Sequence, residues 1–337
     1  MFPTVPKIIL DTDPGGDDIF ALLWLQSLVK QGLAELVAVT TAGGNVSTEK
    51  TFSSASRILS LGGLAEVEVG RGVALTHSSD DASHIHGSDG MGNLSAQLPA
   101  PVHRYETARY SDEILIDRLN AMPGEITVIA IAPLTNLAAA EKKHPGILRK
   151  AKEIIIMGGA FHCPGNVTPH AEFNLWFDPE AAEIVLNSRD DLVITSLDVT
   201  RRLVFTREMG NAIRYGSASL HAQSNPTSEL SKFLTNLCEF MISTALKYRE
   251  TDGTLGFLVH DAATLGYLFY PETMVWRRAR VQIETREGWT RGMTAIDDRN
   301  LAKQPANAWI STEVDATRFF TNLIEDLKAL NKGSGKP

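Results

Sequence analysis

The chain is predicted to fold as a single α/β domain with a mainly parallel sheet that is covered by helices on both faces. Short apolar runs typical of buried strands, such as 36–41 and 153–157, alternate with helical patterns through the first two thirds of the sequence. Among the 337 residues no repeat, heptad run or linker marks a division, and 43% are apolar, which is ample for one core. We therefore expect one domain over residues 1–330 and a polar, flexible tail over 331–337.

Each expected element has its own signal. The first strand, 7–10, is an apolar run that stops at an acidic turn, and a helix should follow from about Asp17 at near-helical apolar spacing. The second strand, 36–41, ends at a Gly-Gly pair, and a helix should follow from near Ser47. Further strands are expected at 67–69, 126–132, 153–157 and 192–197, with late strands at 275–284 and 292–296. A helix that includes Leu137 is expected directly after the strand at 126–132, and another is expected to begin at Pro179. Further helices are expected over 229–249, 261–268 and 316–330.

Polar loops follow several of these strands. In an α/β sheet covered on both faces, ligands bind beyond the carboxyl ends of the strands. A long loop over 72–104 is rich in Ser, His, Gly and Asp, and loops of that length are usually functional or disordered. We expect one common site, built from 11–18, 43–45, 132–136 and 158–174.

Charge and composition restrict the class of partner. The formal net charge of −8 argues against nucleic acid or an anionic membrane as the main partner, since both attract basic patches. It is compatible with a small neutral ligand and a bound cation. The two cysteines, Cys163 and Cys238, are expected to be free thiols. Because we find neither a secretion signal at the start nor an apolar run long enough to span a bilayer, a soluble cytoplasmic protein is expected.

Four aspartates lie within eight positions directly after the first strand: Asp11, Asp13, Asp17 and Asp18. Crowded carboxylates raise one another's pKa unless a cation neutralises them, and hard oxygen ligands suit calcium or magnesium. Capping of the following helix would explain Asp17 and Asp18, because the helix dipole favours negative charge there. It does not explain Asp11 and Asp13, which precede the turn. The cluster therefore favours a divalent metal site.

The run Asp-Thr-Asp-Pro-Gly-Gly-Asp-Asp at 11–18 resembles the N-terminal signature of the inosine–uridine-type nucleoside hydrolases. Further blocks resemble the same family in its order, over about residues 7 to 330. These blocks are 132–138, 157–159, Asn166, 172–174, 178–182, 259–261, 292–294 and Asp297. The resemblance implies a nucleoside-hydrolase fold with an open, mixed sheet and a Rossmann-like core. It also implies Ca²⁺ as cofactor, a ribonucleoside substrate and a homodimer or homotetramer.

The resemblance assigns the metal ligands and the general base to residues of this chain. Asp13 matches the general base, which activates a calcium-bound water and itself lies near the metal. Asp18 and Asp261 match calcium-binding carboxylates, and the carbonyl of Ile131 falls where the family supplies a main-chain ligand.

The resemblance also assigns the ribose site. Asp17 and Asn174 match the residues that hold the 2′- and 3′-hydroxyls, while Asn166 and Glu172 match those that hold the 5′-hydroxyl. Two further ribose-site residues are expected, Asn45, which supports the base aspartate, and Asp261.

The chemistry requires these residue types. Cleavage of a ribosyl C–N bond builds positive charge on the sugar, which surrounding carboxylates and amide oxygens stabilise. A metal lowers the pKa of its bound water, and Asp13 can then take the proton. His260, beside Asp261, is expected to be catalytic, because an ordinary histidine pKa suits protonation of the departing base. An ordinary buried histidine is the alternative.

Two residues are candidates for the lid or the base subsite. His86 lies with His84 in the long loop, in a stretch that resembles the family's substrate-covering loop, although a solvated polar loop is an equal alternative. Tyr248 lies twelve positions before His260, where the family often places an aromatic; packing into the core is the alternative. Base selectivity is expected to lie in 76–92 and 217–256, with a broad or uridine/inosine preference, because neither segment contains a tryptophan.

Two other functions share part of this pattern. A magnesium-dependent phosphatase of the haloacid-dehalogenase type also opens with Asp-x-Asp after a strand, but the pair Asp17-Asp18 has no place in its scheme. A non-catalytic ribose- or nucleoside-binding protein would use the same ribose ligands without needing Asp13 as a base.

Overall fold

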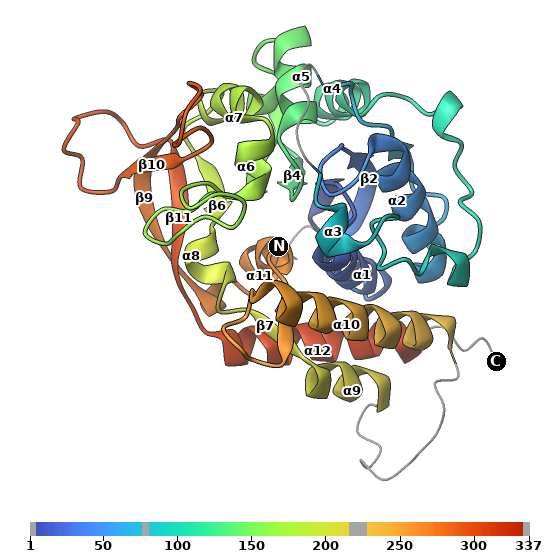
Figure 1. The fold of residues 1–337 in the computed structure, drawn as a ribbon. Helices are drawn as coiled ribbons and strands as arrows, with labels where there is room; N and C mark the ends of the chain where they lie inside the picture. Colours follow the sequence, from blue (N-terminus) through green and yellow to red (C-terminus); the bar gives the residue numbers. More distant parts are fainter. Residues whose placement is uncertain (1–4, 76–80, 216–227, 333–337) are drawn as a thin grey trace.

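A computed structural model describes residues 5–75, 81–215 and 228–332 (Figure 1). The nine strands of the main sheet run in the order β10-β9-β11-β6-β5-β4-β1-β2-β3. The parallel strands are β1 Lys7–Thr12, β2 Glu35–Thr41, β3 Val69–Gly70, β4 Ile126–Ala130, β5 Glu153–Met157, β6 Leu192–Thr195 and β11 Ala308–Val314. At one edge, β9 Met274–Ile283 is antiparallel to both β11 and β10 Thr294–Asp297. The predicted mixed, mostly parallel sheet is confirmed.

Helices cover both faces of this sheet, so two cores form. One core joins one side of the strands, for example Ile8 and Ile129, to α1 and α12, and the other joins the opposite side, for example Ile9 and Val128, to α4 and α5. The alternation along each strand produces this division, because successive side chains point to opposite faces. Figure 1 shows α4, α5 and α7 on one side and α1, α10 and α12 on the other.

The helices have the following bounds. They are α1 Gly16–Lys30, α2 Thr48–Gly62, α3 Ser83–His86, α4 Ser111–Ala121, α5 Thr135–Lys143, α6 Phe173–Phe177, α7 Pro179–Leu186, α8 Leu197–Thr200, α9 Arg207–Tyr215, α10 Glu229–Tyr248, α11 Ala262–Phe269 and α12 Ala316–Lys332. A separate two-stranded antiparallel sheet pairs β7 Val204–Thr206 with β8 Gly256–Leu258. No helix in the described parts of the chain combines the length and apolarity that a membrane crossing requires.

Several element boundaries differ from the sequence predictions. β4 ends at Ala130 and β6 at Thr195, and the apolar residues after them belong to turns and to α8. The sequence patterns missed α4 and β11; β11 is half exposed, with Trp309 42% accessible, so its pattern is not a continuous apolar run. Helix α12 continues through Lys332 into the predicted tail, and 333–337 lie outside the described residues. Cys163 and Cys238 are unpaired, as expected.

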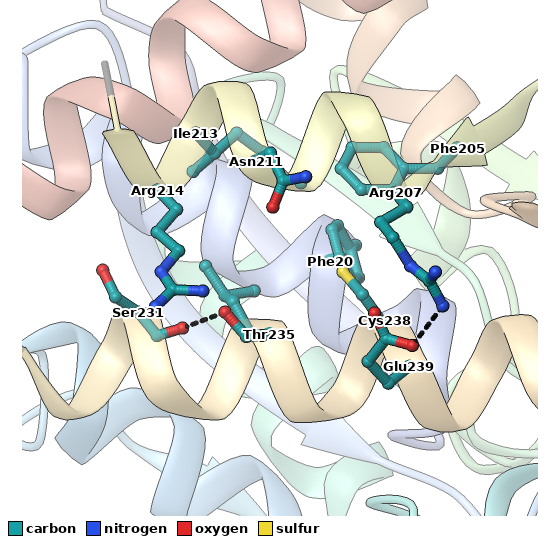
Figure 2. A pocket seen from close by; sticks show the side chains of 12 residues that line it. Phe20, Phe205, Arg207, Asn211, Ile213, Arg214, Ser231, Thr235, Cys238 and Glu239 are labelled. Carbon is teal, nitrogen blue, oxygen red and sulfur yellow. Dashed lines mark hydrogen bonds and ion pairs between the residues drawn. The ribbon is translucent and has the colours of Figure 1, made fainter. Parts of the chain in front are cut away.

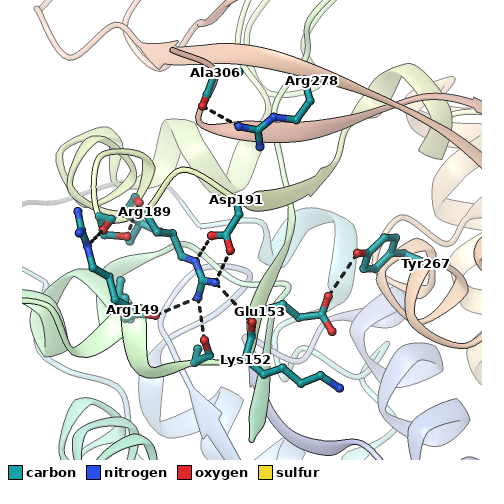
Figure 3. Close-up of polar contacts among 12 residues, drawn as sticks. Arg149, Lys152, Glu153, Arg189, Asp191, Tyr267, Arg278 and Ala306 are labelled. Atoms are coloured by element: carbon teal, nitrogen blue, oxygen red, sulfur yellow. Dashed lines mark hydrogen bonds and ion pairs between the residues drawn. The ribbon is translucent and has the colours of Figure 1, made fainter. Parts of the chain in front are cut away.

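A buried arginine organises the amino edge of the sheet, where β5 and β6 begin (Figure 3). The guanidinium of Arg189 donates to the carbonyls of Leu148 at 3.0 Å and Ala151 at 3.2 Å. It also forms a two-pronged pair with the carboxylate of Asp191. Nearby, the hydroxyl of Tyr267 on α11 donates to Glu153. The polar groups of Arg189, Asp191 and Glu153 therefore have partners within the chain.

Candidate active site

The acidic turn between β1 and α1 is built around the carboxylate of Asp18. This carboxylate accepts hydrogen bonds from the Thr12 hydroxyl at 2.6 Å, the backbone amide of Asp13 at 3.2 Å and that of Gly15 at 3.0 Å. The side-chain amide of Asn45, which follows β2, donates to the same carboxylate at 3.0 Å. Asp18 therefore caps α1 as well as facing the site, and the metal and capping roles are compatible.

Asp13 is fully buried with one oxygen held and the other free. Its Oδ2 accepts from the backbone amide of Asn45 at 2.7 Å, whereas its buried Oδ1 has no hydrogen-bond partner. Gly44 permits this approach, because a Cβ at that position would overlap Oδ2. Burial, followed by the charge of Asp18, raises the pKa of Asp13 well above its usual range.

Three more carboxylates converge beside this residue. One oxygen from each of Asp17, Asp18 and Asp261 lies within 4.8 Å of the others, and all three residues are buried. Asp261 follows β8 at the start of α11, so distant parts of the chain meet here. Burial, then repulsion from Asp18, raises the pKa of Asp17 to about 8, and burial, then Asp17, raises that of Asp261.

The donor set fits a divalent cation that prefers oxygen. None of the ion pairs among the described residues involves this cluster, so no Lys or Arg side chain neutralises it. The unpartnered Oδ1 of Asp13 is the kind of buried polar atom that a ligand satisfies. The tightest group contains Asp17, which the sequence assigned to the ribose, and does not contain Asp13.

Asn174 joins the acidic site to the neighbouring strands. From α6, its side-chain amide donates to the carbonyl of Ile131, just beyond β4, at 3.0 Å and to that of Met157 at 3.3 Å. No described residue donates to its Oδ1, which is therefore available to a ligand. The carbonyl of Ile131 keeps a second lone pair for a metal.

Glu172 and Asn166 occupy different environments. Glu172 is buried and caps α6: it accepts from the amides of Asn174 at 2.8 Å, Gly159 at 3.0 Å and Leu175 at 3.2 Å. Asn166 is exposed, and its Oδ1 accepts from a backbone amide of α6 at 2.9 Å. Glu172 thus holds the wall of the site, and Asn166 lies on the surface loop before it.

No sequence pattern indicated that Asp11 and Asn136 form a buried hydrogen-bonded pair. The side-chain amide of Asn136 donates to Asp11 at 2.8 Å and to the carbonyl of Thr41 at 2.9 Å, while the Thr40 hydroxyl donates to Asp11 at 2.6 Å. Burial raises the pKa of Asp11 to about 7. Asp11 therefore ties β1, β2 and α5 together.

His260 contacts a residue that no sequence signal marked. Its Nδ1 lies 2.7 Å from the hydroxyl oxygen of Thr200, on α8. Burial, followed by the charge of Arg201, lowers the pKa of His260 to about 3. The sequence interpretation took an ordinary histidine pKa for His260, whereas its surroundings in the structure shift this pKa downwards.

The long loop packs on the acidic turn. The backbone amide of Gly16 donates to Nδ1 of His86 at 2.9 Å, and His86 is only 9% exposed. Burial lowers the pKa of His86 to about 4. Tyr248, at the end of α10, is 39% exposed and packs edge-on against His84, with ring centroids 5.3 Å apart. The loop therefore packs on the acidic turn through the buried His86, and Tyr248 is partly exposed and not part of the core. Of the predicted selectivity segments, 76–80 and 217–227 lie outside the described residues.

A separate pocket lies between α9 and α10 (Figure 2). Apolar side chains such as Phe20, Phe205 and Ile213 contribute to its lining. An ion pair between Arg207 and Glu239 spans it. None of the predicted site residues lines this pocket, so the chemistry belongs to the carboxyl edge of the sheet.

Comparison with known sequences identifies the family of the chain. A model of the family described as inosine-uridine preferring nucleoside hydrolase matches residues 8–321, which include every candidate site residue. The chain is 34% identical over 306 residues to a probable uridine nucleosidase 1 of Oryza sativa subsp. japonica, covering 90% of this chain and 88% of that protein. It is 32% identical over 327 residues to an inosine-uridine preferring nucleoside hydrolase of Leishmania major, covering 96% and 98%.

Solved structures share the fold. A purine-preferring ribonucleoside hydrolase from Gardnerella vaginalis superposes with a TM-score of 0.84 at 27% identity, covering 97% of this chain and 100% of that one. The plant nucleoside hydrolase PpNRh1 superposes with a TM-score of 0.82 at 29% identity, covering 96% and 99%.

Proposed function

Because the chain belongs to the inosine-uridine preferring nucleoside hydrolase family, whose members cleave ribonucleosides, we propose a calcium-dependent N-ribohydrolase with Asp13 as its general base. Family membership makes the phosphatase and the non-catalytic binder wrong interpretations. The observation that carries the proposal is the convergence of the buried carboxylates of Asp17, Asp18 and Asp261, together with the buried Oδ1 of Asp13, which has no hydrogen-bond partner.

Asp13, Asp18, Asp261 and the carbonyl of Ile131 hold the calcium ion, and the position of Asp17 in the tight group adds a fifth candidate ligand. When bound, the ion supplies counter-charge to the carboxylates and lowers the pKa of a coordinated water. Calcium is favoured over magnesium because it accepts many oxygen ligands in irregular geometry.

Asp13 takes a proton from the attacking water. Its Oδ2 is fixed by the amide of Asn45, so the free Oδ1 is the atom that accepts this proton. Asn45 also donates to the main-chain carbonyl of Asp13 at 3.0 Å, which holds the whole residue in place.

Side chains around the ribose bind and orient it. Asp17 and Oδ1 of Asn174 accept from the 2′- and 3′-hydroxyls, while Asn166 and Glu172 hold the 5′-hydroxyl. These negative or oxygen-bearing groups stabilise the positive charge that develops on the sugar as the C–N bond breaks. 2′-Deoxynucleosides are therefore poor substrates.

On the base side, His260 donates a hydrogen bond from Nε2 to the departing base, which His86 in the long loop and Tyr248 at the end of α10 also contact. The proton that completes the free base comes from solvent, because a neutral histidine cannot readily give up its only ring proton. We assign a broad or uridine/inosine preference, since the relatives' names divide between uridine, inosine-uridine and purine substrates.

The proposal also includes the location, the pathway and the assembly: the protein is a cytoplasmic enzyme of nucleoside catabolism and forms a homodimer or homotetramer. Light scattering after size-exclusion chromatography measures the assembly state.

The decisive experiment measures release of ribose from uridine, inosine, adenosine, cytidine and xanthosine, with calcium and after chelation. Asp13→Ala should lower kcat by about 10³-fold or more, because the general base and one of the metal ligands are lost, while ribose binding is kept because the other metal ligands and the ribose ligands remain. Asp112→Ala is the matched control: Asp112 is also a fully buried aspartate, but on α4, paired with Lys143 at 2.6 Å, and its loss should leave kcat unchanged. Turnover that survives chelation, or an active Asp13→Ala enzyme, would overturn the proposal.

A further inference from the structure

We propose that Thr200 is a positioning residue that holds the His260 ring in the tautomer with its proton on Nε2. The proposal rests on the role of His260 as a hydrogen-bond donor to the departing base. Thr200 is fully buried at the end of α8, and its hydroxyl oxygen lies 2.7 Å from His260 Nδ1, although the two residues are 60 positions apart.

The direction of this hydrogen bond follows from the surroundings of Thr200. Among the described residues, His260 Nδ1 is the only partner of the Thr200 hydroxyl. If the hydroxyl accepted a proton from Nδ1, its own hydrogen would be buried without an acceptor, which is costly. The hydroxyl therefore donates and Nδ1 accepts, and because a ring nitrogen that accepts a hydrogen bond carries no proton, the ring proton of His260 is on Nε2.

His86 provides an internal precedent. Its Nδ1 accepts from the backbone amide of Gly16 at 2.9 Å, and an amide can only donate, so the ring proton of neutral His86 is also on Nε2. The two histidines beside the acidic site thus have the same tautomer. At His86 the backbone imposes it, whereas at His260 a replaceable side chain does.

The segment that carries Thr200 also holds the ribose loop. The carboxylate of Asp198 accepts from the backbone amides of Phe161 at 2.9 Å and His162 at 2.8 Å. The guanidinium of Arg201 donates to the carbonyl of Gly165 at 2.7 Å. Residues 198–201 therefore contact both the histidine and the loop that carries Asn166, and fix one relative to the other.

The chemical consequence concerns the leaving base. As the C–N bond breaks, the bonding electron pair goes to the base nitrogen, and Nε2–H stabilises the growing negative charge without transferring its proton. The water oxygen bonds to the ribose carbon, its proton passes to Asp13, and solvent protonates the free base. Without the Thr200 donor, the ring can rotate or move its proton to Nδ1, and the Nε2 donor is lost.

Leaving-group dependence tests this role. Thr200→Val removes the hydroxyl at nearly constant shape and should lower kcat on uridine and inosine by about tenfold or more, with the roughly 10²–10⁴-fold effect of a full acid–base group as the upper limit. Hydrolysis of p-nitrophenyl β-D-riboside, whose leaving group needs no stabilisation, should change less than about twofold in the same variant. Thr200→Ser restores the donor and should restore nucleoside turnover.

Thr195→Val is the matched control. Thr195 is a fully buried threonine on β6 whose hydroxyl donates to the carbonyl of Ile156 at 3.2 Å, away from His260. Its loss should not change the ratio of rates on the two substrates. Equal losses on both substrates in Thr200→Val would overturn the positioning role.

Two further measurements separate this proposal from the proposed function. Nitrogen-15 NMR of calcium-loaded protein, with His260→Ala for assignment, should show the Nε2–H tautomer in the wild type and a mixture in Thr200→Val. An Nδ1–H signal from His260 in the wild type would overturn the proposal even if Thr200→Val does not fold. If His260→Ala hydrolyses uridine normally, His260 has no role at the departing base, and the proposal for Thr200 fails with it. If His260→Ala is impaired but Thr200→Val has normal kinetics, the role of Thr200 is refuted and that of His260 stands.

Discussion

The amino and carboxyl edges of the main sheet bury charged groups in opposite ways. At the amino edge, Arg189 is paired with Asp191, and its remaining donors meet main-chain carbonyls (Figure 3). The pKa of Asp191 is correspondingly lowered, chiefly by its hydrogen bond to Arg189. At the carboxyl edge, burial and mutual repulsion raise the pKa of Asp13, Asp17 and Asp261. The chain thus supplies counter-charge to Arg189 at the amino edge, whereas the described residues supply none to the carboxylates at the carboxyl edge, where the proposed calcium ion would supply it.

The largest expected effect breaks the carboxyl edge. Asp261→Asn keeps the shape of the side chain and should lower kcat/KM for uridine by about 10³-fold, because a metal ligand is lost. Yet the metal-free variant should be more stable than metal-free wild type by about 1 kcal/mol, because a buried like charge is removed. Steady-state kinetics and urea unfolding in chelator measure the two effects. A less stable variant in chelator would show that the carboxylates are compensated within the chain.

Without the metal, the free energy of unfolding should depend on pH, because the ion then no longer neutralises the buried carboxylates. The folded-state pKa values of Asp11, about 7, and Asp17, about 8, lie above the ordinary value of 3.8, so the folded state binds more protons than the unfolded state between these limits. The free energy of unfolding therefore falls as pH rises from about 4 to about 8, with a slope of up to about 1.4 kcal/mol per pH unit for each proton. Calcium should flatten this slope. Thermal unfolding from pH 4 to 8, with chelator and with calcium, provides the comparison, and equal slopes would contradict it.

At the amino edge, Arg189→Met should affect stability alone. It leaves Asp191 and the carbonyl of Ala151 without the Arg189 donor, while the carbonyl of Leu148 keeps the backbone amide of Ala151. The cost is about 2 kcal/mol in the free energy of unfolding, moderated because Asp191 is solvent-exposed. The kinetic constants of the folded enzyme should not change. Arg149→Met is a milder control, since Arg149 makes one bond, to the carbonyl of Ser188 at 2.8 Å. A large loss of kcat in Arg189→Met would mean that the two edges are coupled.

The smallest effect is expected from Tyr267→Phe. It removes the 3.3 Å hydrogen bond to Glu153 but keeps the ring, which packs edge-on against Trp276 with centroids 4.8 Å apart. The free energy of unfolding should fall by about 0.5 kcal/mol, without kinetic change. Urea unfolding measures it, and a loss of several kcal/mol would show that this bond anchors the edge.

Site residues that lie close together in the sequence were predictable, whereas contacts between distant parts of the chain were harder to predict. Asp13, Asp17 and Asp18 were recognisable because they are neighbours on one turn, and the resemblance added Asn45, Asn174 and Asp261. The contact of Thr200 with His260 had no signal, because a single threonine in a four-residue helix resembles any other. The same limit applied to the fold: continuous apolar strands were found, while the half-exposed β11 was not.

By itself, the sequence determined the strand–helix alternation, the acidic turn and the family, because these depend on residues close together or on ordered motifs. Only the tertiary structure decided that Asp261 meets Asp17 and Asp18, that Asp13 keeps one oxygen free, and that two histidines are neutral with Nδ1 occupied. Hydrogen bonds and desolvation act over a few ångströms of space, whichever residues the folded chain brings there.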